Sequence, residues 1–151
     1  MPGIEAQQAH TIIVGVDGSD SSTAALGWAC EQARRTDSTI DAIGAWEWPM
    51  SFGAAIPIPD GYDPAADALT MLATVIEPVA AEFPSVTIRP VVLEGHAAEV
   101  LVEASRRADL LVVGSRGHGE FSGLFIGSVS HHCASYAHSP VLIYRAKETN
   151  S

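Results

Sequence analysis

The chain has 151 residues, of which 47% are hydrophobic and 17% are charged. This length suits one domain with a buried core, and the composition argues against disorder. Eight Lys and Arg against eighteen Asp and Glu give a formal net charge of −10. Nucleic acids and anionic membranes bind basic surfaces, so the charge argues against both as partners.

No uninterrupted apolar run approaches the ~20 residues of a membrane span, and residues 1–10 lack the charged-then-apolar order of a signal peptide. The two cysteines, Cys30 and Cys133, are too few for a disulfide framework, which fits a reducing compartment. We therefore expect a cytoplasmic protein with one domain at residues 11–146. Polar tails at residues 1–10 and 147–151 would flank it.

The first third of the chain alternates between apolar runs and a helical pattern. Thr11–Val16 is predicted to be a strand, and Asp20–Arg35 is predicted to be a helix. Either Ser19 or Asp20 can cap the N-terminus of this helix. Thr39–Ala45 is predicted to be a second strand. The stretch that follows, residues 46–64, is rich in Pro, Gly and aromatic residues and is too irregular for one element.

The middle of the chain continues the alternation. Ala65–Phe83 is predicted to be a helix in which Pro78 causes a kink or an early end. Its expected buried stripe comprises Leu69, Leu72, Ile76 and Val79. Val86–Leu93 is predicted to be a strand, and Pro90 places it at a sheet edge because proline cannot donate to a central ladder.

The last third is predicted to contain two helices, Ala97–Arg107 and Ser128–Ala137, and two strands, Leu110–Val113 and Val141–Tyr144. Alternating helices and all-apolar strands predict a parallel sheet covered on both faces. Right-handed crossovers make such a sheet doubly wound, and ligands bind where the winding reverses.

A glycine-punctuated loop follows the strand at Leu110–Val113. It runs through Gly114 and Gly117 to Gly127 and Ser128, where a helix is expected to begin. Helix N-termini carry unpaired N–H groups that attract phosphate, and glycine allows the backbone to approach a ligand closely. The segment therefore predicts a site for a phosphorylated small molecule.

Two common phosphate motifs do not fit this loop. A P-loop needs a lysine directly after its second glycine, and the only lysine in the chain is Lys147. The dinucleotide fingerprint fails because Ser122 stands where the third glycine belongs.

The spacing G-x-x-G, nine residues, then G-[S/T] resembles the nucleotide loop of the universal stress protein family, in its ATP-binding branch. Val14–Ser19 resembles the first strand and turn of that family, and Ala108–Gly114 its fourth strand. Gly127–Ile143 resembles its closing helix and strand. The resemblance extends from about Thr11 to Arg145, and the order and spacing of the pieces make it specific.

The resemblance implies a single-domain, doubly wound, Rossmann-like α/β fold of the adenine nucleotide alpha hydrolase-like type. Its five-stranded parallel sheet would have the order 3-2-1-4-5, which brings Asp17 and Gly114 to one crevice. It also implies ATP and Mg²⁺ as ligands, with Asp17 at the metal, and a homodimer formed through the last strand. The function implied is that of a nucleotide-dependent regulator in the stress response.

The residues expected at the nucleotide are Gly15, Asp17, Ala45, Gly114, Ser115, Arg116, Gly117, His118, Gly119, Glu120, Gly127, Ser128 and Val129. Asp17 would contact ribose, phosphate or Mg²⁺, or would serve only the turn in Asp-Gly-Ser. Gly15 would leave room for the ligand or permit close helix packing. Arg116 would face either phosphate or solvent.

Two other functions remain open from the sequence. One is a slow ATPase or adenylyl-handling hydrolase on the same fold; the other is a dimeric interaction module that has lost its nucleotide. The chain has no nucleophile elbow and no sign of an activated thiolate, so we expect no catalytic set and at most weak ATP hydrolysis. Trp46 and Trp48 would either stack on adenine or pack within the fold.

Overall fold

A computed structural model describes residues 10–48, 50–51, 54–55, 57–116 and 127–145. Its sheet has five parallel strands in the order β5-β2-β1-β6-β7. Numbered along the chain, these five strands have the predicted order 3-2-1-4-5. They are β1 (His10–Gly15), β2 (Ser38–Trp46), β5 (Ile88–Glu94), β6 (Leu110–Gly114) and β7 (Val141–Tyr144).

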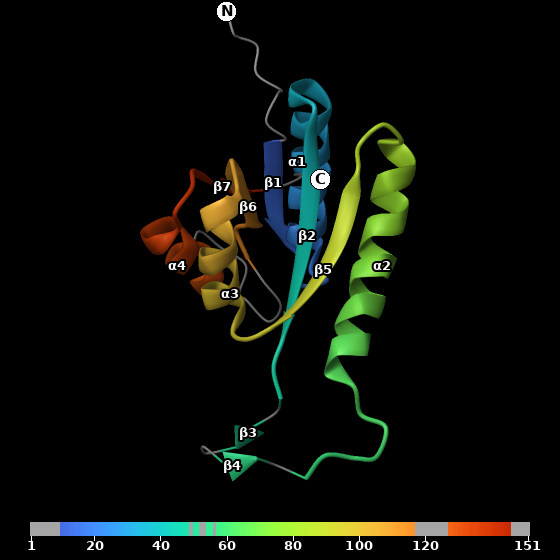
Figure 1. The fold of residues 1–151 in the computed structure, drawn as a ribbon, viewed down its shortest axis with the longest axis vertical. Coiled ribbons are helices and arrows are strands. Elements are labelled where there is room, and N and C mark those ends of the chain that lie inside the picture. The colour runs from blue at the N-terminus through green and yellow to red at the C-terminus, as the bar shows by residue number, and fades with distance from the viewer. Residues whose placement is uncertain (1–9, 49, 52–53, 56, 117–126, 146–151) are drawn as a thin grey trace, which may run out of the picture.

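Helices cover both faces of the sheet (Figure 1). One face carries α1 (Asp20–Thr36) and α2 (Pro64–Glu82). The other carries α3 (Ala97–Ala104), which continues as a 3-10 turn over Ser105–Arg107, and α4 (Ser128–Tyr136). A short antiparallel pair, β3 (Met50–Ser51) and β4 (Ala54–Ala55), lies away from the sheet in the segment between β2 and α2.

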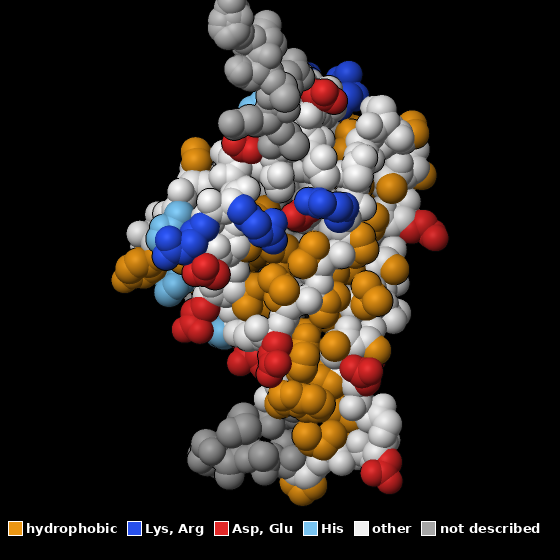
Figure 2. Space-filling model, in the orientation of Figure 1, with side chains coloured by type: hydrophobic (Ala, Val, Ile, Leu, Met, Phe, Trp, Pro, Cys, Tyr) orange, Lys and Arg blue, Asp and Glu red, His pale blue; other side chains and the backbone are white. Residues whose placement is uncertain are grey.

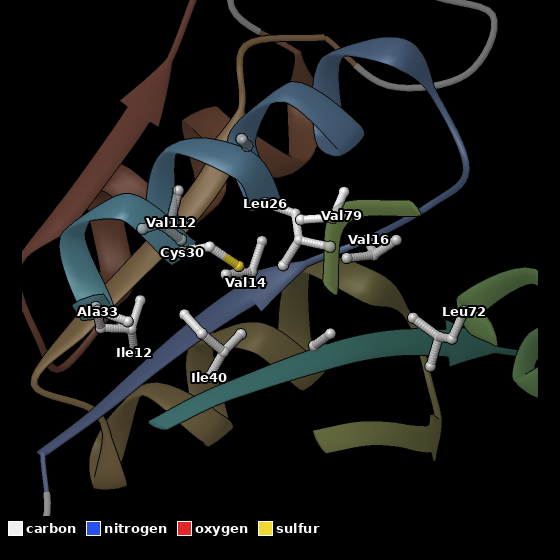
Figure 3. Close-up of a cluster of buried hydrophobic side chains, with 13 residues drawn as sticks. Ile12, Val14, Val16, Leu26, Cys30, Ala33, Ile40, Leu72, Val79 and Val112 are labelled. Carbon is white, nitrogen blue, oxygen red and sulfur yellow. The ribbon is translucent and has the colours of Figure 1, made fainter. Parts of the chain in front are cut away.

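The core has one layer on each face of the sheet because neighbouring strand residues point to opposite sides. Ile12 and Val14 pack with Leu26 of α1 and Leu72 of α2, as Figure 3 shows. On the other face, Ile13 belongs to a cluster that also includes Ile43, Leu101, Leu111 and Cys133. The domain therefore has the predicted buried core, which consists of one cluster on each face of the sheet.

Helix α2 departs from its predicted pattern at two positions. Leu69 is 49% exposed, whereas Leu72 is buried. Leu69 follows the buried Ala68 by one residue, about 100° around the helix, which turns it off the packed stripe. Of the two outcomes predicted at Pro78, a kink or an early end, the early end does not occur, because α2 continues to Glu82. Pro78 lies on the exposed side, where water can satisfy the carbonyl that it leaves unpaired.

By length and mean hydropathy, α2 also meets the criteria for a membrane-spanning helix, the one helix of the described residues that does. It packs against β2 and β5, and its Leu72 and Val79 are buried. One face of α2 is therefore packed against the sheet.

The edge strand β5 is tied to its neighbour by a buried carboxylate. Asp41 of β2 accepts hydrogen bonds from Arg89 Nε of β5 and from a terminal guanidinium nitrogen of Arg107, each at 2.7 Å. Pro90 lies on the same edge strand, where its missing N–H costs no ladder bond. The predicted edge position of this strand is confirmed.

Candidate functional site

A cavity of about 460 Å³ opens where β1, β2 and β6 end. Strands β1 and β6 are neighbours, and the chain winds in opposite directions from them, so the cavity lies at the switch point. It brings Asp17 and Gly114 together, as expected. The predicted residues that line it are Gly15, Asp17, Ala45, Gly114, Arg116, Gly127 and Val129.

Two of these glycines permit close packing between elements. A Cβ on Gly15 would lie 2.7 Å from Leu101 Cδ1 of α3, which supports the helix-packing interpretation of this residue. A Cβ on Gly114 would lie 2.8 Å from the backbone carbonyl carbon of Ser21 in α1. Gly114 therefore lets the end of β6 approach the first turn of α1.

The turn between β1 and α1 is closed by its own polar groups. Asp17 Oδ1 accepts hydrogen bonds from the Ser19 N–H at 2.9 Å and from the Ser19 hydroxyl at 2.6 Å. Of the two predicted capping residues, Ser19 caps α1 by accepting from the Ser22 N–H at 3.1 Å. The Ser22 hydroxyl in turn accepts from the Asp17 N–H at 3.2 Å. Asp17 thus serves the turn and also borders the cavity.

The ends of the glycine loop are joined by backbone hydrogen bonds. The Gly127 N–H donates to the Ser115 carbonyl at 2.6 Å, and the Ser115 N–H donates to the Tyr144 carbonyl at 2.9 Å. The Arg116 N–H donates to Ser21 Oγ at 3.3 Å. The first of these bonds joins the two ends of the loop, and the other two attach its first residues to β7 and to α1. All three N–H groups are engaged within the fold, so phosphate would have to use other donors.

The first turn of α4 supplies such donors. Its N-cap is Gly127, at φ −61° and ψ 159°, and among the described residues no side chain caps the helix. The N–H groups of a helix's first turn have no partner within the helix. Val129 and Ser130 of this turn line the cavity, and the Ser130 hydroxyl fixes the helix to β6 by donating to the Gly114 carbonyl.

Several predicted contacts are not placed at the cavity by the described residues. Gly117, His118, Gly119 and Glu120 lie outside them. Ser115 is buried, and Ser128 is exposed at the start of α4; neither lines the cavity. Their roles at a nucleotide remain predictions.

The opposite wall of the cavity consists of residues that the sequence analysis did not assign to the site. Its α2 part is a helical stripe formed by Pro64, Asp67, Ala68 and Met71. Spacings of three and four residues put these side chains on one face of the helix. The periodicity is present in the sequence, but only the packing of α2 shows which of its faces meets the cavity.

Aromatic side chains complete this wall. Trp46 and Tyr62 line the cavity, and the Trp48 ring contacts both, at centroid distances of 5.4 Å and 6.3 Å respectively. Both contacts are edge-to-face. Figure 2 shows apolar side chains gathered on this part of the surface, where the chain leaves β2 toward α2. Trp46 is thus at the site, with Trp48 as its support.

The charges of the described lining residues are unevenly distributed. Asp17, Glu47 and Asp67 are acidic, and Arg116 is their one fixed cation. Glu47 lies 3.4 Å from His96 Nδ1. Within the described ranges, no group of three or more His, Cys, Asp or Glu side chains could hold a metal ion without a ligand's help.

The two cysteines are not reactive centres. Both are fully buried, and burial raises the pKa of each thiol to about 11. A buried, protonated thiol is a poor nucleophile. Cys133 is therefore a core residue.

A second, shallower groove of about 640 Å³ lies between β5 and α3. It is lined by apolar residues such as Leu93 and Val100, with charged residues such as Glu99 and Arg106 at its border. It is away from the switch point and shares none of the predicted site residues.

The fold and the site define a class: a doubly wound α/β domain with a ligand cavity at the carboxyl ends of its strands. Within that class, the model of the universal stress protein family matches residues 8–145. The chain therefore belongs to the universal stress protein family.

Relatives and solved structures agree with this assignment. Universal stress protein Rv2623 of Mycobacterium tuberculosis is 36% identical over 94% of this chain and 47% of its own length. The chain thus spans about half the length of the curated relatives it matches. UspA from Lactobacillus plantarum superposes with a TM-score of 0.73 at 20% identity, covering 93% of this chain and all of that one, and so confirms the fold. A universal stress protein solved in complex with cAMP has a TM-score of 0.68 and 27% identity over 93% of this chain and all of its own.

Proposed function

We propose that this protein binds an adenine nucleotide, ATP in particular, in the switch-point cavity and acts as a nucleotide-dependent regulator in the cytoplasmic stress response. The observation that carries the proposal is the composition of the cavity. One end has the uncapped N-terminus of α4 and Arg116; the other has aromatic rings. Family membership and a cAMP-bound relative support adenine as the base.

The phosphate end fits an anion for two independent reasons. The first turn of α4 has N–H groups without helix partners, and the helix dipole places partial positive charge there. Arg116 adds a full charge at the same end. The aromatic end fits a base because Trp46 and Tyr62 offer faces or edges to a planar ring.

Mg²⁺ fits this site only together with phosphate. Asp17 contributes a carboxylate at the cavity, and one of its oxygens already accepts from Ser19. Mg²⁺ is commonly held by one or two carboxylates together with substrate phosphates. Asp17 would therefore be its protein ligand, and the ion would neutralise phosphate charge near the acidic side chains.

Isothermal titration calorimetry with ATP and AMP tests the proposal. Gly127→Val should weaken binding at least ten-fold, which corresponds to about 1.4 kcal/mol, because a branched side chain would stand over the α4 N–H groups. Backbone strain would not contribute, since φ is negative at Gly127. Arg116→Ala should weaken binding less, because salt screens one partly exposed cation.

Circular dichroism of each variant controls for folding. If wild-type protein shows no heat with either nucleotide at millimolar concentration, the proposal fails. If the folded Gly127→Val variant binds like wild type, the α4 N-terminus does not hold the phosphate.

We also propose a homodimer formed through β7. This edge strand is a run of apolar residues, Val141–Tyr144, whereas the other edge carries Arg89 and Pro90. An open apolar edge can pair with another strand. The Ser115 N–H bonds to the Tyr144 carbonyl, so Ile143, one residue earlier, directs its backbone groups away from β6.

Light scattering tests the dimer. Wild-type protein should give about twice the mass of the 15.8 kDa chain. Ile143→Pro should give a monomer, because it removes an outward N–H while leaving the bonds between β6 and β7 in place. A wild-type monomer at high micromolar concentration would exclude this interface.

A further inference from the structure

One carboxylate on the aromatic wall of the cavity has no partner among the described residues. Asp67 is an exposed residue of the cavity-facing stripe of α2, and it is the one charged residue of that stripe. Within the described part of the chain its side chain makes no hydrogen bond or ion pair. The other two acidic lining residues differ, because Glu47 faces His96 and Asp17 accepts from Ser19. Asp67 is thus an acceptor available to a ligand.

The position of Asp67 relates it to the base rather than to the phosphate. The phosphate end follows β6, and the aromatic wall follows β2, with β1 between them. Two strand spacings separate these ends by about 10 Å. A nucleotide with its phosphate at α4 would therefore direct its base toward Trp46 and Asp67. A carboxylate close to the phosphate would instead repel it.

We propose that Asp67 is a specificity-determining residue that accepts a hydrogen bond from the exocyclic amino group of the base. This inference rests on the proposed nucleotide function. An ionised carboxylate only accepts hydrogen bonds. The 6-amino group of adenine donates to it, whereas the 6-oxo group of hypoxanthine presents a second acceptor and is repelled. Asp67 would thus favour AMP over IMP, two ligands that otherwise have the same ribose and phosphate.

A purely structural role for Asp67 makes a different prediction. A carboxylate in the first turn of a helix interacts favourably with the helix dipole. Removing its charge would then lower the melting temperature and leave the choice of base unchanged. The ratio of AMP to IMP affinity therefore separates recognition from helix stabilisation.

The experiment measures AMP and IMP binding by calorimetry for wild type, Asp67→Asn and the matched control Glu77→Gln. Glu77 is an exposed acidic residue of the same helix that does not line the cavity. Asp67→Asn should lower the AMP-to-IMP affinity ratio about ten-fold. AMP would lose a charge-assisted hydrogen bond to the carboxylate, whereas IMP would gain a donor, because the asparagine amide can turn its NH₂ toward the oxo group. Glu77→Gln should leave the ratio unchanged.

A second measurement needs no variant. Wild-type protein should bind purine riboside 5′-monophosphate, which lacks the amino group, about ten-fold more weakly than AMP. An unchanged ratio in Asp67→Asn, or equal affinity for these two ligands in wild type, would overturn the assignment of Asp67 while leaving nucleotide binding intact. If wild type binds none of the nucleotides, the proposed function fails and this inference fails with it.

Discussion

The two walls of the cavity use their polar groups differently. On the wall formed by β1, α1 and β6, most polar groups are already bonded within the fold: Asp17 to Ser19, and the Arg116 N–H to Ser21. On the wall formed by β2 and α2, Asp67 has no partner among the described residues, and aromatic rings meet edge to face. The first wall is part of the scaffold, whereas the second has groups left for recognition.

This difference shows that lining a cavity and binding a ligand are separate properties. Gly15 and Gly114 line the cavity, yet the space that a side chain would need is filled by Leu101 and Ser21. Substitutions on the scaffold wall should therefore change the free energy of unfolding first. Substitutions on the recognition wall should change affinity with little effect on folding.

The largest effect is expected from Gly114→Ala. The new Cβ would meet the backbone of Ser21, which cannot move without shifting the first turn of α1. We expect the free energy of unfolding to fall by about 1–3 kcal/mol, as overpacking typically costs. Urea denaturation measures this change.

Gly27→Ala is the matched control for Gly114→Ala. Gly27 lies inside α1, and no atom lies within 4 Å of its ideal Cβ. The same substitution should therefore stabilise the protein, by about 0.5–1 kcal/mol, through helix propensity. If both variants change the free energy of unfolding equally, the close contact between Gly114 and Ser21 does not constrain the scaffold wall.

A smaller loss is expected from Ser130→Ala. The buried Ser130 hydroxyl donates to the Gly114 carbonyl and ties α4 to β6. Its removal should lower the free energy of unfolding by about 1 kcal/mol. Ser135→Ala, which removes an exposed hydroxyl that bonds to the His131 carbonyl of the same helix, should change it by less than about 0.5 kcal/mol. Thermal unfolding that ranks the two in the reverse order would contradict the proposed anchor.

The smallest effect on stability is expected on the recognition wall, from Trp46→Leu. Loss of the indole should lower the free energy of unfolding only slightly, because Trp46 lies at the end of β2 and belongs to neither core cluster. It should weaken AMP about three- to ten-fold, in line with the 0.5–1.5 kcal/mol typical of aromatic pairs. Trp48→Leu should have a smaller effect on affinity, since Trp48 contacts the Trp46 ring but does not line the cavity. Equal AMP affinities in wild type and Trp46→Leu would show that the Trp46 ring does not contact the ligand.

The scaffold wall was largely predictable from sequence. Apolar runs locate the strands, and a parallel sheet collects residues at their carboxyl ends, so the positions of Asp17 and Gly114 at strand ends follow from the sequence. The strand order needed the family resemblance, because alternation by itself permits other orders. The role of the glycines was harder to predict. A glycine that allows a helix to pack closely and a glycine that allows a ligand to bind closely cannot be distinguished by their sequence pattern.

The recognition wall was not predictable for a physical reason. Residues 46–64 lack a regular period, so nothing in the sequence fixes how α2 is set against β2. The stripe of Pro64, Asp67 and Met71 is recognisable only once α2 is packed on the sheet. The prediction that Leu69 is buried was wrong for the same reason, because an apolar helix offers more than one possible packed face.

A two-dimensional NMR titration of the whole chain with AMP tests the central claim most directly, because it locates the ligand. Binding in the switch-point cavity should shift the amides of both walls, those of Gly114 and Ser130 together with those of Trp46 and Asp67. The amides of Leu93 and Val100, in the groove between β5 and α3, should not shift. Shifts confined to that groove, or no shifts at millimolar AMP, would contradict the account.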